Sequence, residues 1–276
     1  MKTLLLLNRT ISTALPSFVM GIVNATPDSF FEKSRGGVET ALRLIDEGAD
    51  ILDIGGESTR PGSEYISADE EIRRVIPVIS EIRKVSNIPI SVDTRKSEVM
   101  KACFEEGADI LNDISALEDD EKLASFAAQK EIPVILMHKR GNPSTMQKNT
   151  VYQNIFDEVN GYLINRIEFA KARGISEQKI WLDPGIGFGK NTADNFELIR
   201  RCGEIAEGKF PLLMALSRKT CIGEVTGRAV EERLSGTLAA NLISVQNGAS
   251  IVRVHDVKEC ADSLKILSYV DKIPKI

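Results

Sequence analysis

The sequence predicts an α/β protein of one domain, a (β/α)8 TIM barrel preceded by a short N-terminal hairpin. Short apolar runs alternate with amphipathic helical patterns along the whole chain, which is typical of a parallel sheet built from βα units. The length of 276 residues fits one such barrel, which needs about 250 residues. The phrase EGAD at 47–50 and 106–109, with NGAS at 247–250, marks points where a helix closes and a strand begins. We therefore expect a single domain over residues 1–276.

The expected barrel strands are eight short apolar runs, most of them followed by polar or glycine residues. They lie at 18–23, 51–54, 90–92, 110–111, 134–137, 180–182, 212–216 and 251–254. Residues 1–17 precede the first run, and we expect them to form a hairpin that caps the barrel floor. A doubly wound open sheet is the competing fold, but eight successive units without a dinucleotide-binding fingerprint favour closure.

Helical patterns fill the segments between these runs. They lie near 37–48, 69–86, 95–107, 120–130, 152–173, 194–206, 230–248 and 257–270. Several end in glycine, as at Gly48, Gly107, Gly174 and Gly248, where the residue after a helix favours a positive φ. These glycines support the expected helix boundaries.

Composition excludes several classes of protein. Apolar residues make up 42% and charged residues 27% of the chain, which indicates a globular core and no disorder. The net charge of −5, with both signs mixed, gives no basic stripe for nucleic acid and no polybasic patch for a membrane surface. No apolar run approaches the roughly 20 residues of a membrane span. The four cysteines are far apart and suggest neither zinc nor disulfides, so we expect a cytoplasmic protein.

Polar residues follow the apolar runs on their C-terminal side, where barrel enzymes hold their active sites. Asp93 and Asp183 end two of these runs, and Asn112 follows a third. Either acid alone could equally be a helix-capping residue. Two acids at equivalent strand ends need partners, however, and the N–H groups of a ligand would supply them. The two acids and the amide indicate a nitrogen heterocycle as ligand.

The loop DPGIGFGK at 183–190 contains three glycines but matches neither nucleotide-binding motif. Lys190 stands where the dinucleotide fingerprint needs its last glycine, and Pro184 stands where a P-loop needs its first. Two interpretations stay open: a structural turn, or a turn that lets the backbone and Phe188 approach a ligand.

Cationic residues gather at the last two runs, where Lys219 follows the seventh run and Arg253 lies in the eighth. Lys219, Arg253 and, in the second loop, Arg60 could each be a solvated surface charge. Arg253 shares strand parity with His255, so both should point to one face. Loops after the seventh and eighth strands of barrels often bind phosphate, and here they also carry Ser217. The pattern predicts an anionic, phosphorylated ligand.

Hydrolase motifs are missing from the sequence. It contains no Ser-His-Asp order, no H-E-x-x-H and no paired catalytic glutamates. His138 ends the fifth run, and we interpret it as a structural residue because a lone histidine more often is one.

Five strings in order closely resemble the dihydropteroate synthase family. They are NATPDSF at 24–30, DIGGESTRPG at 53–62, SVDT at 91–94, DPGIGFG at 183–189 and SRK at 217–219. MH at 137–138, GNPSTM at 141–146 and RVH at 253–255 belong to the same pattern. The resemblance covers residues 18–260, and the ordered set is far more specific than any single string.

The resemblance implies that 6-hydroxymethyl-7,8-dihydropterin pyrophosphate condenses with p-aminobenzoate, giving 7,8-dihydropteroate and pyrophosphate in folate synthesis. It implies that the pterin is bound by Asp93, Asn112, Asp183 and Lys219, with the two acids facing its ring N–H groups. Pyrophosphate would be held by Asn24, Arg253 and His255, with Mg2+ bridging the Asn24 side chain and phosphate oxygens.

The family also implies where the second substrate lies and how the reaction runs. p-Aminobenzoate would be framed by Phe30, Thr59, Pro61, Phe188 and Ser217, and Arg60 would join a loop that closes over both substrates. The implied reaction resembles an SN1 displacement without an enzyme nucleophile. Its catalytic residues would be Asp93, Lys219, Arg253 and His255. Arg253 and His255 would stabilise the leaving group, and Asp93 the pterin cation. We expect sulfonamides to compete with p-aminobenzoate.

One departure from the family lies in the first loop, which usually continues as SDGG but reads FEKS at 31–34 here. Whether Glu32 replaces the usual aspartate stays open. Two alternatives are a domain that transfers methyl groups from methyltetrahydrofolate to a corrinoid protein, and a non-catalytic pterin-binding paralogue. TRP at 59–61 and the SRK loop favour the synthase. Family members are commonly homodimers, and the apolar stretch LAANLI at 238–243 is compatible with an interface or with barrel packing.

Overall fold

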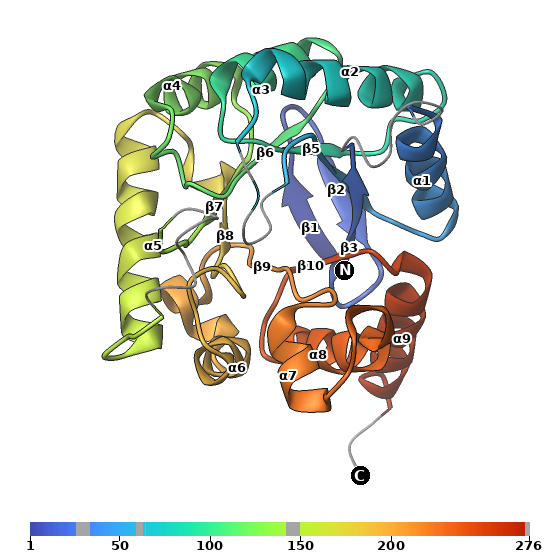
Figure 1. The fold of residues 1–276 in the computed structure, drawn as a ribbon, viewed down its shortest axis with the longest axis vertical. Helices are drawn as coiled ribbons and strands as arrows, with labels where there is room; N and C mark the ends of the chain where they lie inside the picture. Colours follow the sequence, from blue (N-terminus) through green and yellow to red (C-terminus); the bar gives the residue numbers. More distant parts are fainter. Residues whose placement is uncertain (26–33, 59–62, 64, 142–149, 274–276) are drawn as a thin grey trace.

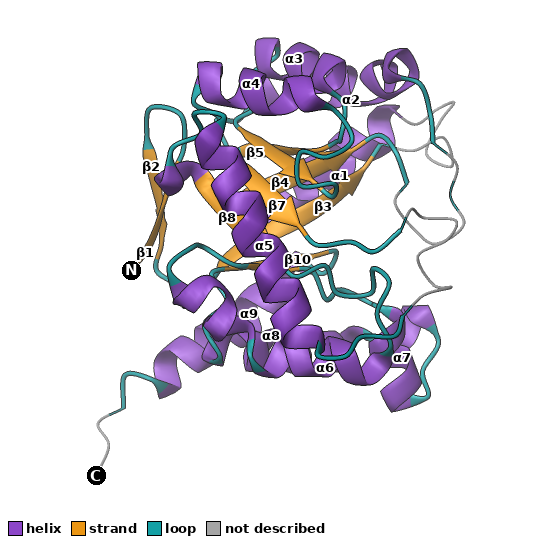
Figure 2. Cartoon of the chain, turned by 90° about the vertical axis from the view of Figure 1, so that its left-hand side faces the viewer, coloured by secondary structure: helices purple, strands orange, loops and turns teal. Residues whose placement is uncertain are grey.

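The computed structural model describes residues 1–25, 34–58, 63, 65–141 and 150–273 (Figure 1). Its first elements are β1 (Lys2–Leu5) and β2 (Thr10–Thr13), which pair antiparallel. Figure 2 shows this pair lying across one end of the other strands. The predicted N-terminal hairpin is confirmed.

The remaining strands form one parallel sheet, which has eight strands in the described part of the chain. They are β3 (Phe18–Asn24), β4 (Ile51–Gly55), β5 (Ile90–Asp93), β6 (Ile110–Asp113), β7 (Val134–Met137), β8 (Ile180–Asp183), β9 (Leu213–Met214) and β10 (Ile251–Val254). The order is β8-β7-β6-β5-β4-β3-β10-β9. A parallel bridge between Leu182 and Leu212 joins the two ends. The sheet therefore closes into the predicted barrel.

Helices alternate with these strands and surround the barrel (Figure 1). They are α1 (Ser34–Asp46), α2 (Ala68–Arg83), α3 (Ser97–Glu105), α4 (Glu121–Lys130), α5 (Ile155–Ala172), α6 (Thr192–Arg200), α7 (Thr220–Thr226), α8 (Leu234–Gln246) and α9 (Val257–Val270). Short 3-10 helices occur at η3 (Glu177–Lys179), η4 (Cys202–Gly208) and η5 (Val230–Glu232). None of the helices in the described ranges is long and apolar enough to cross a membrane.

Three elements differ from the sequence prediction. β9 is shorter than the run at 212–216, because the chain leaves the sheet after Met214 and turns at Arg218, where φ is +56°. The helix expected at 194–206 ends at Arg200, and the chain continues as η4, where Ala206 and Glu207 have left-handed φ angles of 47° and 57°, so one continuous helix does not cover this segment. The short helix α7, which ends at Gly227 with a φ of 69°, was not predicted.

The hairpin plugs the N-terminal end of the barrel. Leu4 and Leu6 are buried there in one cluster with inward-facing strand residues, namely Phe18, Met20, Ile51, Ile110, Ile135, Trp181, Leu213 and Ile251. Lys179 is 6% exposed, and its ammonium donates to the carbonyl oxygens of Leu6 and Leu7. This floor cluster closes one end of the barrel and confines any site to the other. All four cysteines are buried and free.

Candidate active site

Strand alternation decides which polar side chains enter the barrel. Ile110 of β6 and Ile251 of β10 lie in the floor cluster, so Asn112 and Arg253, two residues further along, also point inward. The same step leads from Ile51 to Asp53 in β4. The inward positions therefore change from apolar at the floor to polar at the C-terminal strand ends. This polar layer is the candidate site.

Arg253 joins three strands at the centre of the polar layer. Its Nε donates to Asp53 Oδ2 at 2.5 Å, and its Nη2 donates to Asp93 Oδ2 at 2.9 Å. Asn112 Nδ2 donates to the same Asp53 oxygen at 3.1 Å. Among the described residues these bonds use Nε and Nη2 of the guanidinium, which leaves Nη1 for an anionic ligand.

Asp53 is a site residue that the sequence prediction missed. It is fully buried, and its Oδ1 atom has no hydrogen-bond partner in the described part of the chain. A buried carboxylate oxygen of this kind needs a donor. The signal was present, because Asp53 interrupts the apolar run at 51–54. Its pairing with Arg253, 200 residues away, was not visible in one sequence.

Asp93 is 9% exposed and has an unusual acidity. Burial raises the pKa of the Asp93 carboxyl to about 7; the Arg253 guanidinium opposes this shift and the nearby Asp53 carboxylate adds to it. Strong shifts with a specific charged partner are typical of functional groups. Asp93 thus combines an ion pair with a carboxyl that ionises near neutral pH.

Asp183 lies at the end of β8, and the glycine-rich loop that follows is folded onto it. The Gly185 N–H donates to Asp183 Oδ1 at 2.7 Å. Burial raises the pKa of the Asp183 carboxyl, although that N–H and the charges of Lys219, Lys190 and Arg253 lower it. The turn therefore brings loop backbone directly beside a buried acid of the polar layer, as the interpretation in which backbone approaches a ligand requires.

Lys219 and Phe188 meet on the same side of the layer. The Lys219 ammonium lies 4.5 Å from the centre of the Phe188 ring, a cation–π distance. Burial lowers the pKa of Lys219 to about 8, and Arg253 lowers it further while Asp183 raises it. Lys219, from the loop after β9, thus lies against the loop after β8, within electrostatic reach of Asp183.

Ser217 forms a second pair with His255, which lies two residues after Arg253 in the sequence. Ser217 Oγ lies 2.9 Å from His255 Nδ1, and the His255 N–H donates to Ser217 Oγ at 3.2 Å. Arg218, which lies between Ser217 and Lys219 in the sequence, does not join this pair. It forms a bidentate ion pair with Asp256 at 2.6 and 3.1 Å. The loops after β9 and β10, which are expected to bind phosphate, are therefore joined by hydrogen bonds.

Asn24 ends β3 and is exposed, directly opposite Gly55 in the strand register. No group of three or more His, Cys, Asp or Glu side chains able to hold a metal ion occurs in the ranges described. A single amide oxygen suits an ion that takes most of its ligands from phosphate and water, as Mg2+ does. The residues therefore fit a metal that arrives with an anionic substrate.

Several predicted site residues lie outside the described residues. They are Phe30, Thr59, Arg60 and Pro61, together with Glu32 of the altered first loop. Their roles stay predictions. The base of the second loop is described, and there Glu57 accepts from the Ile66 N–H at 2.8 Å and pairs with Lys96 at 2.8 Å and Arg95 at 3.1 Å. Sequence reasoning did not single out Glu57, although it lies in the string at 53–62.

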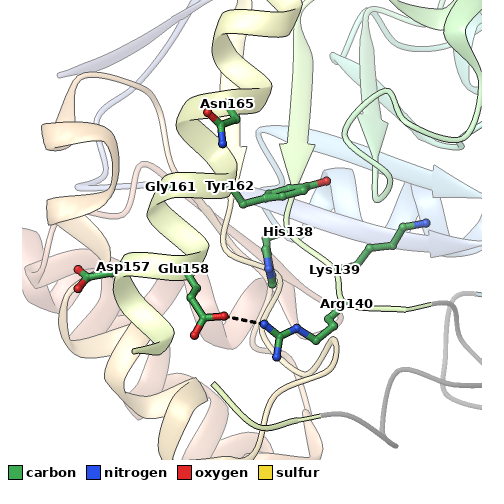
Figure 3. Close-up of a pocket in the computed structure, with 8 residues that line it drawn as sticks. All are labelled: His138, Lys139, Arg140, Asp157, Glu158, Gly161, Tyr162 and Asn165. Atoms are coloured by element: carbon green, nitrogen blue, oxygen red, sulfur yellow. Dashed lines mark hydrogen bonds and ion pairs between the residues drawn. The ribbon is translucent and has the colours of Figure 1, made fainter. Parts of the chain in front are cut away.

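A cavity of about 510 Å3 lies beside this layer, between the end of β7 and α5 (Figure 3). It is lined by His138, Lys139, Arg140, Asp157, Glu158, Gly161, Tyr162 and Asn165. Arg140 and Glu158 pair across it at 2.7 Å. It contains none of the predicted site residues, so we place the chemistry at the strand ends, where buried acids face cations.

The polar layer has two chemically distinct halves. Strands β4, β5, β6 and β8 supply Asp53, Asp93, Asn112 and Asp183, whose oxygens suit the N–H groups of a polar ring. The loop after β9 and strand β10 supply cations and a histidine that suit an anion. The arrangement can hold one ligand with a nitrogen-rich ring and a phosphorylated arm.

Comparison with known proteins agrees with a site for a nitrogen-rich ring that carries a phosphorylated arm. Residues 20–255 match the family described as pterin binding enzyme. The dihydropteroate synthase of Escherichia coli strain K12 is 45% identical over 257 residues, with 90% of each protein covered. That of Neisseria meningitidis serogroup B is 50% identical over 262 residues, again with 90% of each covered.

Solved structures resemble the whole barrel. Xanthomonas albilineans dihydropteroate synthase with 4-aminobenzoic acid has a TM-score of 0.88 and 43% identity, covering 94% of each chain. The same enzyme in complex with 7,8-dihydropteroate has a TM-score of 0.88 and 39% identity, covering 99% and 100%. Yersinia pestis dihydropteroate synthase with a sulfonamide drug has a TM-score of 0.92 and 36% identity, covering 99% and 100%.

Proposed function

The chain belongs to the dihydropteroate synthase family of pterin-binding enzymes, and from that premise we propose that it makes 7,8-dihydropteroate. The substrates are 6-hydroxymethyl-7,8-dihydropterin pyrophosphate and p-aminobenzoate, and the second product is pyrophosphate. The protein is a transferase that forms a carbon–nitrogen bond. Relatives that have been solved with 4-aminobenzoic acid and with 7,8-dihydropteroate support this choice.

One observation carries the proposal: a buried set of acids faces a set of cations within one barrel mouth. Arg253 connects the two sets, since it bonds both Asp53 and Asp93. A pterin needs acceptors for its ring N–H groups, and its pyrophosphate arm needs cations. The polar layer supplies both at once.

We assign the pterin ring to Asp93, Asn112, Asp183 and Lys219. The two acids accept ring N–H groups, and Asn112 both donates and accepts. Asp53 stands behind them, because it holds Asn112 at 3.1 Å and Arg253 at 2.5 Å. It orients the two side chains that contact the ligand.

We assign the pyrophosphate to Arg253, His255 and Asn24. Asn24 would also hold Mg2+ together with phosphate oxygens, and the bound ion offsets negative charge on the leaving group. Arg253 donates from Nη1 while Asp53 and Asp93 keep its plane fixed. A guanidinium that is already oriented needs no reorganisation as the leaving group gains charge.

The reaction breaks the bond between the pterin methylene carbon and the pyrophosphate oxygen. The electron pair leaves with the oxygen, and the methylene carbon becomes cationic, with its charge spread into the pterin ring. The amino nitrogen of p-aminobenzoate then forms the new bond to this carbon and releases a proton. Asp93 as carboxylate stabilises the cation, so the protein needs no nucleophile of its own. Holding the two substrates together adds an orientation term.

We place p-aminobenzoate against Phe188 and Ser217, with Phe30, Thr59, Arg60 and Pro61 completing its surroundings. Phe188 lies beside Lys219, so the aromatic ring of this substrate would stack next to the pterin site. A sulfonamide presents a similar ring and acidic head. The drug-bound Yersinia pestis relative supports competition at this position.

The decisive experiment incubates the purified chain with both substrates and Mg2+ and measures pyrophosphate and dihydropteroate. We expect equal amounts of the two products, inhibition by sulfonamides that is competitive with p-aminobenzoate, and loss of turnover when EDTA removes Mg2+. Pterin binding without pyrophosphate release would instead favour a non-catalytic paralogue. Transfer of a methyl group from methyltetrahydrofolate to a corrinoid would favour the methyltransferase alternative.

A further inference from the structure

Lys190 is a buried lysine that the assignments above do not use. It is 4% exposed, and its ammonium lies 2.9 Å from His138 Nδ1, 2.8 Å from the Gly185 carbonyl oxygen, 3.0 Å from that of Phe188 and 3.4 Å from that of His138. Four acceptors around three N–H groups satisfy the charge without a carboxylate. The ammonium therefore binds the end of β7 to the loop after β8.

The loop that Lys190 holds is glycine-rich and carries part of the candidate site. Gly185, Gly187 and Gly189 have φ angles of 69°, 84° and 66°. Glycine gives such a segment much conformational freedom when nothing constrains it. The segment nevertheless has to place the Gly185 N–H on Asp183 and the Phe188 ring next to Lys219. Its carbonyls at 185 and 188 are the two that Lys190 binds.

The fit between loop and strand is close. A Cβ atom at Gly185 would lie 1.9 Å from the His138 carbonyl oxygen. The His138 N–H donates in turn to the Asp183 carbonyl oxygen at 3.0 Å. The end of β7, the start of the glycine loop and Asp183 therefore form one unit.

The His138 ring is held by Tyr162 in a position where it contacts Lys190. Its ring meets the Tyr162 ring edge-on, with centres 5.0 Å apart and planes at 88° (Figure 3). Burial, with the charges of Lys190 and Arg140, lowers the pKa of His138 to about 2. The imidazole is therefore neutral, and because Lys190 donates to Nδ1, its proton is on Nε2.

We propose that Lys190 is a positioning residue for the pterin site: with His138 as its fixed acceptor, it ties the loop 185–189 to β7 and thereby sets Asp183 and Phe188. The inference rests on the proposed function for the identity of the ligand. Lys190 touches no substrate in this assignment. It acts through the loop backbone.

The first test replaces Lys190 by Met, which keeps the length of the side chain and removes the ammonium. We expect the KM for the pterin pyrophosphate to rise about tenfold or more, the scale of losing hydrogen bonds to a charged group, while kcat changes much less. Titration with 6-hydroxymethylpterin at pH 6.5 should show the same loss of affinity. Burial lowers the pKa of Lys190 to about 7, so this pH favours its ammonium form.

A matched control is available at the other end of the barrel. Lys179 is also buried and also donates to carbonyl oxygens, those of Leu6 and Leu7. Lys179→Met should lower stability without changing the KM for the pterin. If both variants raise that KM equally, the effect is general and the proposal is overturned.

Two variants of His138 test the acceptor and remain informative if Lys190→Met does not fold. In His138→Asn the amide oxygen stands at the place of Nδ1 and can still accept from Lys190. In His138→Leu the side-chain acceptor is removed and only the backbone carbonyl acceptors of Lys190 remain. We expect near-normal pterin affinity in the first variant and, in the second, a loss in the same direction as that of Lys190→Met but smaller. Equal pterin affinity in the two variants would contradict the proposed role of the contact between Lys190 and His138.

Hydrogen exchange separates failure of this inference from failure of the proposed function. In Lys190→Met the amides of 185–189 should exchange about tenfold faster or more, whereas in Lys179→Met they should not. Unchanged exchange in a folded Lys190→Met variant would overturn the tether. Failure of the proposed function would appear elsewhere, as an unaltered chain that releases no pyrophosphate.

Discussion

Arg253 is held by two buried carboxylates, so its removal has two consequences. Arg253→Ala leaves Asp53 and Asp93 without a counter-charge, which should lower the free energy of unfolding by about 3–5 kcal/mol. It also removes a donor from the leaving group, which should lower turnover by about 10² or more. Urea unfolding and steady-state kinetics measure the two effects.

Asp93→Asn provides the contrast. This change removes one carboxylate but leaves Arg253 paired with Asp53, so we expect a smaller loss of stability and a similar loss of turnover, about 10² or more. Near-normal turnover in either folded variant would contradict the assigned roles.

The acidity of two residues predicts a narrow pH range for kcat/KM. Because burial raises the pKa of Asp93 to about 7, its carboxylate is lost as the pH falls below that value. Because burial lowers the pKa of Lys219 to about 8, its ammonium is lost as the pH rises above that value. We expect a bell-shaped profile with its maximum between the two. Lys219→Arg should remove the part of the alkaline limb that Lys219 contributes, since guanidinium stays charged, and leave the part that comes from loss of the Lys190 ammonium. A flat profile from pH 6 to 9 in the unaltered enzyme would refute this account.

Single residues could be predicted from the sequence where local position was enough. Asp93 and Asp183 stand at strand ends, and Arg253 follows from strand parity, because alternation alone fixes the face. Asp53 could not be paired with Arg253, since their contact depends on barrel closure. Lys190 was noticed only as a mismatch to a motif, because its partners are mostly backbone carbonyls, which carry no sequence signal.

Among the elements, the hairpin contributes to stability and not to chemistry. Leu6 is fully buried in the floor cluster, at the end of the barrel opposite the polar layer. Leu6→Ala should lower the free energy of unfolding by about 2–5 kcal/mol, the usual range for a buried leucine, with kcat unchanged in the folded protein. The partly buried Leu7 offers a control, and Leu7→Ala should cost less. A large loss of kcat in folded Leu6→Ala would show coupling between the two ends.

Elements could be predicted where an apolar run was long enough to show its period. The starts of seven strands agree with the predicted runs within the described ranges, and the ends of these strands agree within two residues. The bounds of β9 and the existence of α7 could not be predicted from the sequence. β9 pairs at only two positions, Leu213 and Met214, and α7 has seven residues, too few to show a helical face.

Assembly of the whole molecule gives one further prediction. Ile243 of α8 and Ile266 and Tyr269 of α9 are 48%, 68% and 72% exposed. An interface over α8 and α9, which are neighbouring helices, would bury these side chains. We expect a homodimer, with a mass about twice the 30.4 kDa of one chain by sedimentation equilibrium. Ile243→Arg should give a monomer, and a single-chain mass for the unaltered protein at micromolar concentration would refute this. Cytoplasmic location likewise stays a prediction.

At the level of the molecule, the barrel and its single polar mouth could be predicted because repeated βα units leave few alternatives. The contact that closes the barrel could not be predicted from the sequence. It depends on one bridge, between Leu182 and Leu212, whose strands are joined by a connection that includes the kinked η4. The loops that carry Phe30, Thr59, Arg60 and Pro61 lie outside the described residues, so that part of the site rests on family resemblance alone.

The ion pairs of Arg253 also have a consequence for how the chain is made. A ribosome synthesises Asp53 and Asp93 first, and Arg253 follows them by 200 and 160 residues. Throughout that interval two acids destined for the same buried layer lack their counter-charge, which disfavours early closure of the barrel around them. The last βα unit supplies this counter-charge, the Arg253 guanidinium. A chain that ends before residue 253 lacks the guanidinium that pairs with both Asp53 and Asp93, so we expect the barrel to close stably only after the last βα unit has been made.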